Sequence, residues 1–191
     1  MNEELPALMT EANAIAADAE QTFGRLNRDE LNWKPAADQW SVAQCFEHLI
    51  KINTAYFPQW RRIEEGSYAP SWRDRVPLVA RLFGSMVLRA VQPGSRRKFT
   101  AAHHVEPATG AIAGDIIARF TAHQRDVIEH MRMTGSRDLS AVLVTSPVAP
   151  IAFYSVRDAF KILVAHERRH IAQAERVVNA DGFPKRQARD Q

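Results

Sequence analysis

The feature that most restricts what this chain can fold into is a pair of histidines on the apolar side of a long C-terminal helix. Residues 155–179 carry apolar side chains at helical intervals, and His166 and His170 lie one turn apart, about 40° on a helical wheel. The same side of the wheel holds Ala159, Ile162, Leu163, Ala174 and Val177. Both imidazoles are therefore expected to face a core, where each needs partners for its two nitrogens. A metal ion meets that need if a third ligand comes from another segment.

The candidate third ligand is His48, in a predicted helix over residues 42–64. Ser41 can cap this helix and Gln44 can close a capping box, with Trp40 outside it as the hydrophobic half of a staple. His48 lies on the inward side of the wheel, together with Cys45, Ile52, Ala55 and Tyr56. The three histidines are thus expected to meet between two helices.

Three further segments carry apolar residues at helical intervals and complete the predicted fold. They are residues 3–26, residues 112–133 and a shorter stretch at 77–91. The pattern predicts an all-α protein: a four-helix bundle with crossover connections and an extra short helix inserted between the second and third helices. The length of 191 residues suits one domain spanning residues 1–191.

The remaining segments are punctuated by proline and are expected to interrupt the helices. Residues 28–38 are predicted to be a connector. Pro58 lies within the second predicted helix and indicates a kink or a local break near Phe57. Residues 139–154 contain two prolines and predict an extended crossing segment, with a short strand at 141–144.

Composition limits the cellular compartments and the binding partners that we expect for this chain. A single cysteine, Cys45, excludes an internal disulfide and an all-cysteine zinc site, and no apolar run is long enough to span a membrane. We expect a cytoplasmic protein without a membrane partner. The net charge of +3 comes from arginines concentrated at 61–62, 73–97 and in the tail 185–189. This excess is small for the length, so an arginine-rich solvated surface is favoured over nucleic-acid binding.

The segment His166-Glu167-Arg168-Arg169-His170 also matches the zinc-peptidase pattern H-E-x-x-H. Two charged arginines between the histidines, and the short stretch that follows His170, argue against a peptidase. The favoured interpretation is a three-histidine site of His48, His166 and His170. Three neutral imidazoles suit zinc, nickel or iron and leave coordination positions open, which is typical of catalytic sites. The alternative is that all three are core histidines bonded to backbone or carboxylates.

Other titratable residues have weaker claims to a functional role. The nearest carboxylates in sequence, Glu47 and Glu167, each point about 100° away from the adjacent histidine, so neither is a strong general base. Cys45 is expected to be a small buried hydrophobe. His103 and His104 lie in a predicted loop and are expected to be solvated. His123 and His130 lie on one side of the third long helix, at the border of its apolar stripe, and could line a pocket.

Two motifs in this chain resemble the DinB-like superfamily, which includes YfiT-type proteins. They are Leu31-Asn-Trp-Lys-Pro35 followed by Trp40-Ser-Val-Ala-Gln-Cys-Phe-Glu-His48-Leu49, and the His166-x-x-x-His170 pair on the last helix. The resemblance implies an up-down-down-up four-helix bundle, often a homodimer, with one divalent metal, zinc or nickel, on three histidines. Relatives include thiol S-transferases that use bacillithiol or mycothiol, a mycothiol-dependent maleylpyruvate isomerase, and proteins classed as metal-dependent hydrolases.

These observations favour one function and leave two alternatives open. The leading hypothesis is a thiol-dependent S-transferase in which the metal activates a low-molecular-weight thiol for attack on an electrophilic substrate. Arginines of residues 73–97 would then hold an anionic cosubstrate. The alternatives are hydrolysis by a metal-activated water, and a non-catalytic stress or binding protein with a vestigial metal site.

Overall fold

The structure is a computed structural model that describes residues 4–69, 72–95, 102–135 and 137–184, the side chains of residues 74 and 75 apart. Helices make up most of it, which confirms the predicted all-α class. Four of them pack together as one group: α1 (Glu4–Phe23), α3 (Val42–Thr54), α6 (Ile116–Thr134) and α7 (Val156–Val178). No helix in the described ranges is long and apolar enough to cross a membrane.

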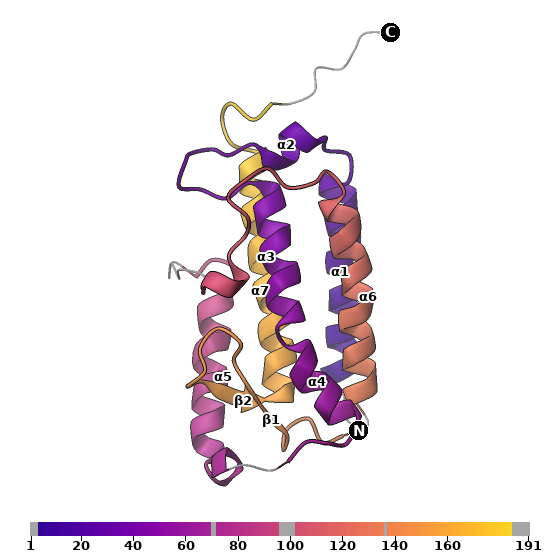
Figure 1. Ribbon diagram of the computed structural model, residues 1–191, viewed down its shortest axis with the longest axis vertical. Coiled ribbons are helices and arrows are strands. Elements are labelled where there is room, and N and C mark those ends of the chain that lie inside the picture. The colour runs from indigo at the N-terminus through magenta and orange to yellow at the C-terminus, as the bar shows by residue number, and fades with distance from the viewer. Residues whose placement is uncertain (1–3, 70–71, 96–101, 136, 185–191) are drawn as a thin grey trace.

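These four helices lie side by side, and each contacts two of the others. Helix α1 packs against α6 and α7, and α3 packs against the same two helices from the other side. In Figure 1, α1 runs upward, α3 and α6 run downward, and α7 runs upward again. The interior between them is filled by large buried side chains, among them Phe23, Phe46, Phe120 and Phe160. The facing surfaces of α3 and α7 are the ones that carry the three histidines.

A fifth helix and a small sheet lie outside this group of four. Helix α5 (Pro77–Val91) occupies the predicted extra position and packs against α7 and against β2 (Phe153–Ser155). Strand β2 pairs antiparallel with β1 (Leu143–Thr145), with Val144 opposite Tyr154. Two short 3₁₀ turns, η1 (Trp72–Arg75) and η2 (His103–Val105), flank α5 in sequence.

Capping side chains fix where the two histidine-bearing helices begin. Ser41 Oγ accepts a hydrogen bond from the Gln44 N–H, and the Ser41 N–H donates to Gln44 Oε1, which is the predicted capping box of α3. Ser155 Oγ accepts from the Asp158 N–H at the start of α7. These caps satisfy amides that would otherwise be unpaired at the helix ends.

The structure corrects the predicted boundaries in three places. Within the predicted connector, α2 (Arg28–Asn32) forms because Asn27 and Glu30 make a reciprocal capping box. Helix α6 begins four residues later than predicted, because the Ile112 N–H donates to Asn32 Oδ1 instead of to a helix. The strand lies at 143–145, not 141–144, since its register is set by pairing with β2.

The predicted kink at Pro58 is confirmed and is a complete break. Helix α3 ends at Thr54, and α4 (Phe57–Glu64) starts after two intervening residues, with the proline in its first turn. Tyr56 lies at this break and its hydroxyl bonds to that of Tyr154 at 2.5 Å. This hydrogen bond connects the break between α3 and α4 to strand β2 of the small sheet.

Candidate metal centre

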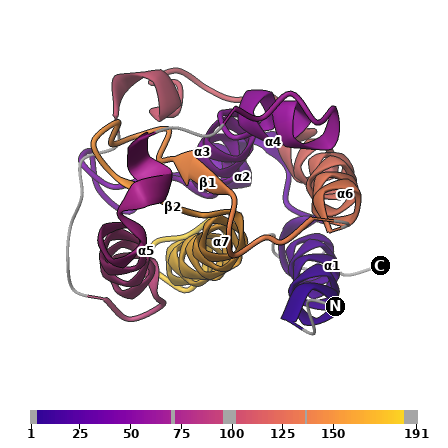
Figure 2. The ribbon, with the colours of Figure 1, turned by 90° about the horizontal axis from the view of Figure 1, so that it is seen from below.

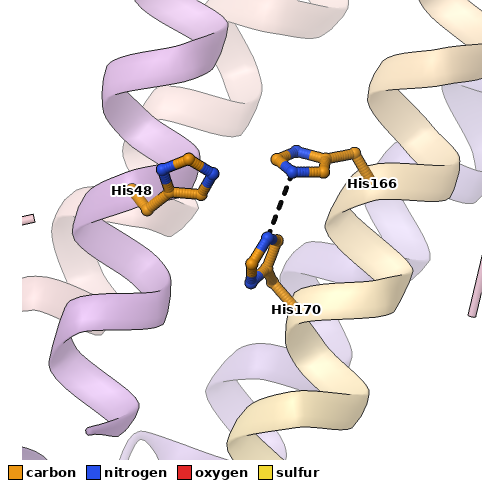
Figure 3. Close-up of side chains that lie close together, drawn as sticks. All are labelled: His48, His166 and His170. Atoms are coloured by element: carbon orange, nitrogen blue, oxygen red, sulfur yellow. Dashed lines mark hydrogen bonds between the residues drawn. The ribbon is translucent and has the colours of Figure 1, made fainter. Parts of the chain in front are cut away.

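The three histidines predicted as ligands converge at one point between α3 and α7. His48 comes from α3, and His166 and His170 come from successive turns of α7 (Figure 3). One ring nitrogen from each lies within 4.8 Å of the other two. His48 and His170 are buried, at 5% and 7% exposure, and His166 is half-buried. Two separately capped helices thus bring three imidazoles together inside the protein.

The spacing of the two α7 nitrogens fits a shared metal ion. His166 Nε2 lies 3.1 Å from His170 Nε2. Nitrogens held tetrahedrally at about 2.0–2.1 Å from one zinc ion lie about 3.3 Å apart. Two Nε2 atoms at this separation either share one proton or share one ion, and a third imidazole facing them favours the ion.

A backbone carbonyl sets the tautomer of His48. His48 Nδ1 lies 2.8 Å from the Val105 carbonyl oxygen, and because a carbonyl only accepts, Nδ1 carries the proton. The lone pair is then on Nε2. By contrast, His170 Nδ1 is buried and makes no hydrogen bond of normal geometry within the described residues, although Gln173 lies close enough to raise the pKa of the ring slightly.

The surroundings keep the three imidazoles neutral, which is the form that binds metal. Burial, followed by the nearby His48 and Arg169, lowers the pKa of His166 to about 3. Burial likewise lowers the pKa of His170 well below its ordinary value, and the neighbouring His166 lowers it further. Burial also lowers the pKa of His48. All three rings therefore have lone pairs available at neutral pH.

Trp40 forms one wall of the site, a role that the sequence did not reveal. Its ring stacks on His170 with centroids 5.6 Å apart and planes at 22°, and its centroid lies 5.0 Å from that of His48. Trp40 is half-buried. We expected only a staple at the start of α3. The structure shows a ring that restricts the rotation of two of the three histidines.

Replacing Trp40 with leucine is expected to weaken zinc or nickel binding by about 10-fold, the lower end of the effect of residues that orient metal ligands. Competition with a chromophoric chelator measures the affinity. The matched control is Trp33→Leu, because Trp33 is also half-buried but packs on Phe183 instead. Equal affinities for the two variants would contradict an orienting role for Trp40.

The neighbouring carboxylates are occupied elsewhere, as their wheel positions predicted. The oxygens of Glu167 accept from Asn53 Nδ2 at 2.7 Å and from Gln124 Nε2 at 2.9 Å, in the core between α3, α6 and α7. Glu47 Oε2 accepts from the Ala108 N–H and pairs with Lys51. In the part of the chain that the structure describes, no carboxylate or thiol joins the three histidines. Cys45 is a buried core residue, and burial raises the pKa of its thiol to about 12.

None of the other histidines in the described ranges belongs to the group of three. The η2 turn carries His103 and His104 at the surface, which confirms the prediction that they are solvated. His130 Nδ1 lies 2.6 Å from Glu64 Oε1, and His123 stacks on Phe57 at 5.1 Å. Both therefore contribute to the packing of α4 on α6.

Among the arginines that the cosubstrate hypothesis named, Arg73 contacts the small sheet. Arg73 Nη1 donates to Thr145 Oγ1, and its guanidinium lies over Phe153. Residues 96–97 and the basic tail 185–189 lie outside the described residues. Arg169 lies close enough to contribute to the lowered pKa of both α7 histidines, after burial and the neighbouring histidines, and it donates a hydrogen bond to the Ala90 carbonyl. Its position between the two histidines is visible in the sequence, but the sequence does not show that its charge acts on both rings.

The fold and the site define a class: helical proteins in which a three-histidine group between packed helices can hold a metal ion. The family model of the DinB superfamily matches residues 12–174, and the chain belongs to this superfamily. Among curated proteins it is similar to the uncharacterized protein YuaE of Bacillus subtilis (strain 168), with 26% identity over 158 residues, covering 80% of this chain and 85% of that protein. A search of the solved structures gave no significant match.

Proposed function

We propose that this protein is a metal-dependent thiol S-transferase. Zinc or nickel would bind His48, His166 and His170, and a low-molecular-weight thiol would react there with an electrophile. The observation that carries the proposal is the convergence of three neutral imidazole nitrogens within 4.8 Å, with no fourth protein ligand among the described residues. Such a set leaves coordination positions open, as catalytic sites require. A divalent ion bound there would lower the pKa of a thiol and hold the thiolate.

The protein's own residues supply position and charge. The Val105 carbonyl keeps the His48 lone pair on Nε2, and Trp40 holds the planes of His48 and His170. The guanidinium of Arg169 favours an anionic cosubstrate over a cationic one. In the net reaction, the thiol loses its proton, sulfur forms a bond to the electrophilic carbon, and the leaving group departs with the bonding electrons.

The placement of the carboxylates favours thiol transfer over hydrolysis. Hydrolysis calls for a general base within hydrogen-bond reach of the attacking water. Glu167 is held by two amides in the core, and Glu47 by a backbone N–H and Lys51. A thiol that is already ionised at pH 7 needs no such base. The site as built therefore suits a soft nucleophile better than water.

A thiol-conjugation screen tests the proposal. Protein loaded with zinc or nickel is mixed with bacillithiol, mycothiol, glutathione or cysteine and a panel of alkylating electrophiles, and the loss of free thiol is followed. We expect at least one pair to react faster than the uncatalysed mixture, and we expect chelator to abolish the difference. A metal-loaded protein that accelerates no pair, or one that hydrolyses esters without any thiol, would refute the assignment.

A further inference from the structure

A short segment that begins at the last residue of η2 is held along α3 by four hydrogen bonds, one of which comes from a histidine of the metal site. We call residues 105–108 the strap. Three strap carbonyls accept from α3 side chains: Val105 O from His48 Nδ1, Glu106 O from Lys51 Nζ and Ala108 O from Gln44 Nε2, each at 2.8 Å. In the fourth bond, the Ala108 N–H donates to Glu47 Oε2 at 2.5 Å. The four α3 residues recur at helical intervals and form one line along the helix.

The strap uses its backbone for these bonds and buries apolar side chains beneath it. Val105 is 1% exposed, and Pro107 is also buried. Three of the four bonds come from side chains that do not belong to the histidine group, so the strap has anchors on both sides of His48. The position of the Val105 carbonyl is therefore set by Gln44, Glu47 and Lys51 together.

We propose that Lys51 and Glu47 are positioning residues for the metal centre, acting through the strap. The inference rests on the proposed metal site at His48, His166 and His170. With the strap in place, the Val105 carbonyl holds the proton on His48 Nδ1 and presents Nε2 to the other two rings. With the strap displaced, His48 is free to rotate and to change tautomer, and only part of its population has Nε2 available.

The coupling works in both directions. An ion on Nε2 withdraws electron density from the ring and makes Nδ1–H a stronger donor to the Val105 carbonyl. Metal binding therefore holds the strap more firmly on α3. By thermodynamic linkage, these two effects are equal in size. The factor by which metal stabilises the strap in its hydrogen-bonded position on α3 is the factor by which that position raises the metal affinity.

Substitutions in the anchors test this without touching a histidine. Lys51→Met removes the bond to Glu106, and Glu47→Ala removes the bond to Ala108. Each is expected to weaken zinc binding by about threefold to tenfold, below the effect of direct partners of metal ligands. Lys51→Arg and Glu47→Gln keep the hydrogen-bonding capacity and are expected to restore most of the affinity. The control is Lys161→Met, since Lys161 is also on a histidine-bearing helix but pairs with Glu4 on α1.

Amide hydrogen exchange at Ala108 supplies a second readout. The Ala108 N–H donates to Glu47, so its exchange should slow on addition of zinc by a factor similar to the affinity lost in the anchor variants. His48→Ala should accelerate this exchange even in metal-free protein, because the Val105 carbonyl loses its donor. An Ala108 exchange rate that is the same with and without zinc would overturn the inference.

The outcomes separate the strap from the proposed activity. If the wild-type protein binds zinc and both anchor variants bind it equally well, the coupling is refuted while the metal site stands. Zinc binding that depends on the anchors, in a protein that transfers no thiol, supports the coupling and refutes the activity. A wild-type protein that binds no divalent transition metal refutes both.

Discussion

Replacing His170 with alanine will reduce the affinity of the protein for zinc or nickel by more than about 100-fold, beyond the range for residues that only orient ligands. The reason is geometric. His170 Nε2 lies 3.1 Å from His166 Nε2, and its ring faces His48 with centroids 4.9 Å apart, so it stands next to both other donors. Two remaining imidazoles cannot hold the ion as three can. Elemental analysis of protein purified without a histidine tag, together with chelator competition, measures the loss.

The matched control for this substitution is His104→Ala. His104 is exposed on η2 and belongs to no metal-holding group in the described residues, so this variant should keep the wild-type metal content. Circular dichroism of both variants checks that the helices are retained. A His170→Ala protein that is folded and still binds one equivalent of metal would exclude His170 as a ligand. The same measurement on His48→Ala tests the contribution of α3.

The inward orientation of the three histidines could be predicted because it depends on periodicity alone. His166 and His170 share the apolar side of their helix, and His48 shares that of another, so packing those two sides together places the rings in one core. The capping signal at Ser41 added a reliable helix start. Neither inference needed to know how the helices are arranged in space.

The supporting contacts could not be predicted in this way. Val105 contributes a backbone carbonyl, and a carbonyl has no side-chain identity for a sequence motif to record. Trp40 precedes its helix, and its stacking on His170 depends on where α7 lies relative to α3. The partners of Glu167 come from α3 and α6, far away in sequence. Contacts between separate helices of this kind appear only once the helices are packed.

The short helix α2 is a different case, because its signal was present in the sequence. Asn27 and Glu30 have the spacing of a capping box, and both reciprocal hydrogen bonds form. The nearby Pro35 and polar residues suggested a connector instead. A cap at the right spacing outweighed the general polarity of the segment.

Glu167 is the buried charge with the largest expected effect on stability. It is fully buried between Asn53 and Gln124, and burial raises its pKa from 4.5 to about 7, while the two amides act in the opposite direction. The folded metal-free protein thus binds this proton more tightly than the unfolded chain does. The resulting stabilisation is fully present below pH 4.5 and is lost as pH rises through 7. Above that pH, the ionised carboxylate costs about 3 kcal/mol of unfolding free energy.

Glu167→Gln is therefore expected to stabilise the metal-free protein at pH 8 by about 1–3 kcal/mol, and to change stability little at pH 5, where the wild-type carboxyl is protonated. The neutral amide can be accommodated, because Gln124 Oε1 is buried without a hydrogen-bond partner within the described residues and can accept a hydrogen bond if the Gln124 amide turns over. Urea unfolding at the two pH values measures the difference.

The exposed pair of Glu129 with Arg132 on α6 provides the control for the loss of a carboxylate charge. Glu129→Gln removes the same charge without a burial cost, so its effect on stability should be small and equal at pH 5 and pH 8. If Glu167→Gln instead destabilises the protein at pH 8, the carboxylate is held ionised by more favourable interactions than the two amides provide. Its charge would then be part of the metal centre's electrostatics, since Glu167 adjoins His166 in the chain. A stabilised variant with unchanged metal affinity would show that the core carboxylate and the metal site are energetically separate.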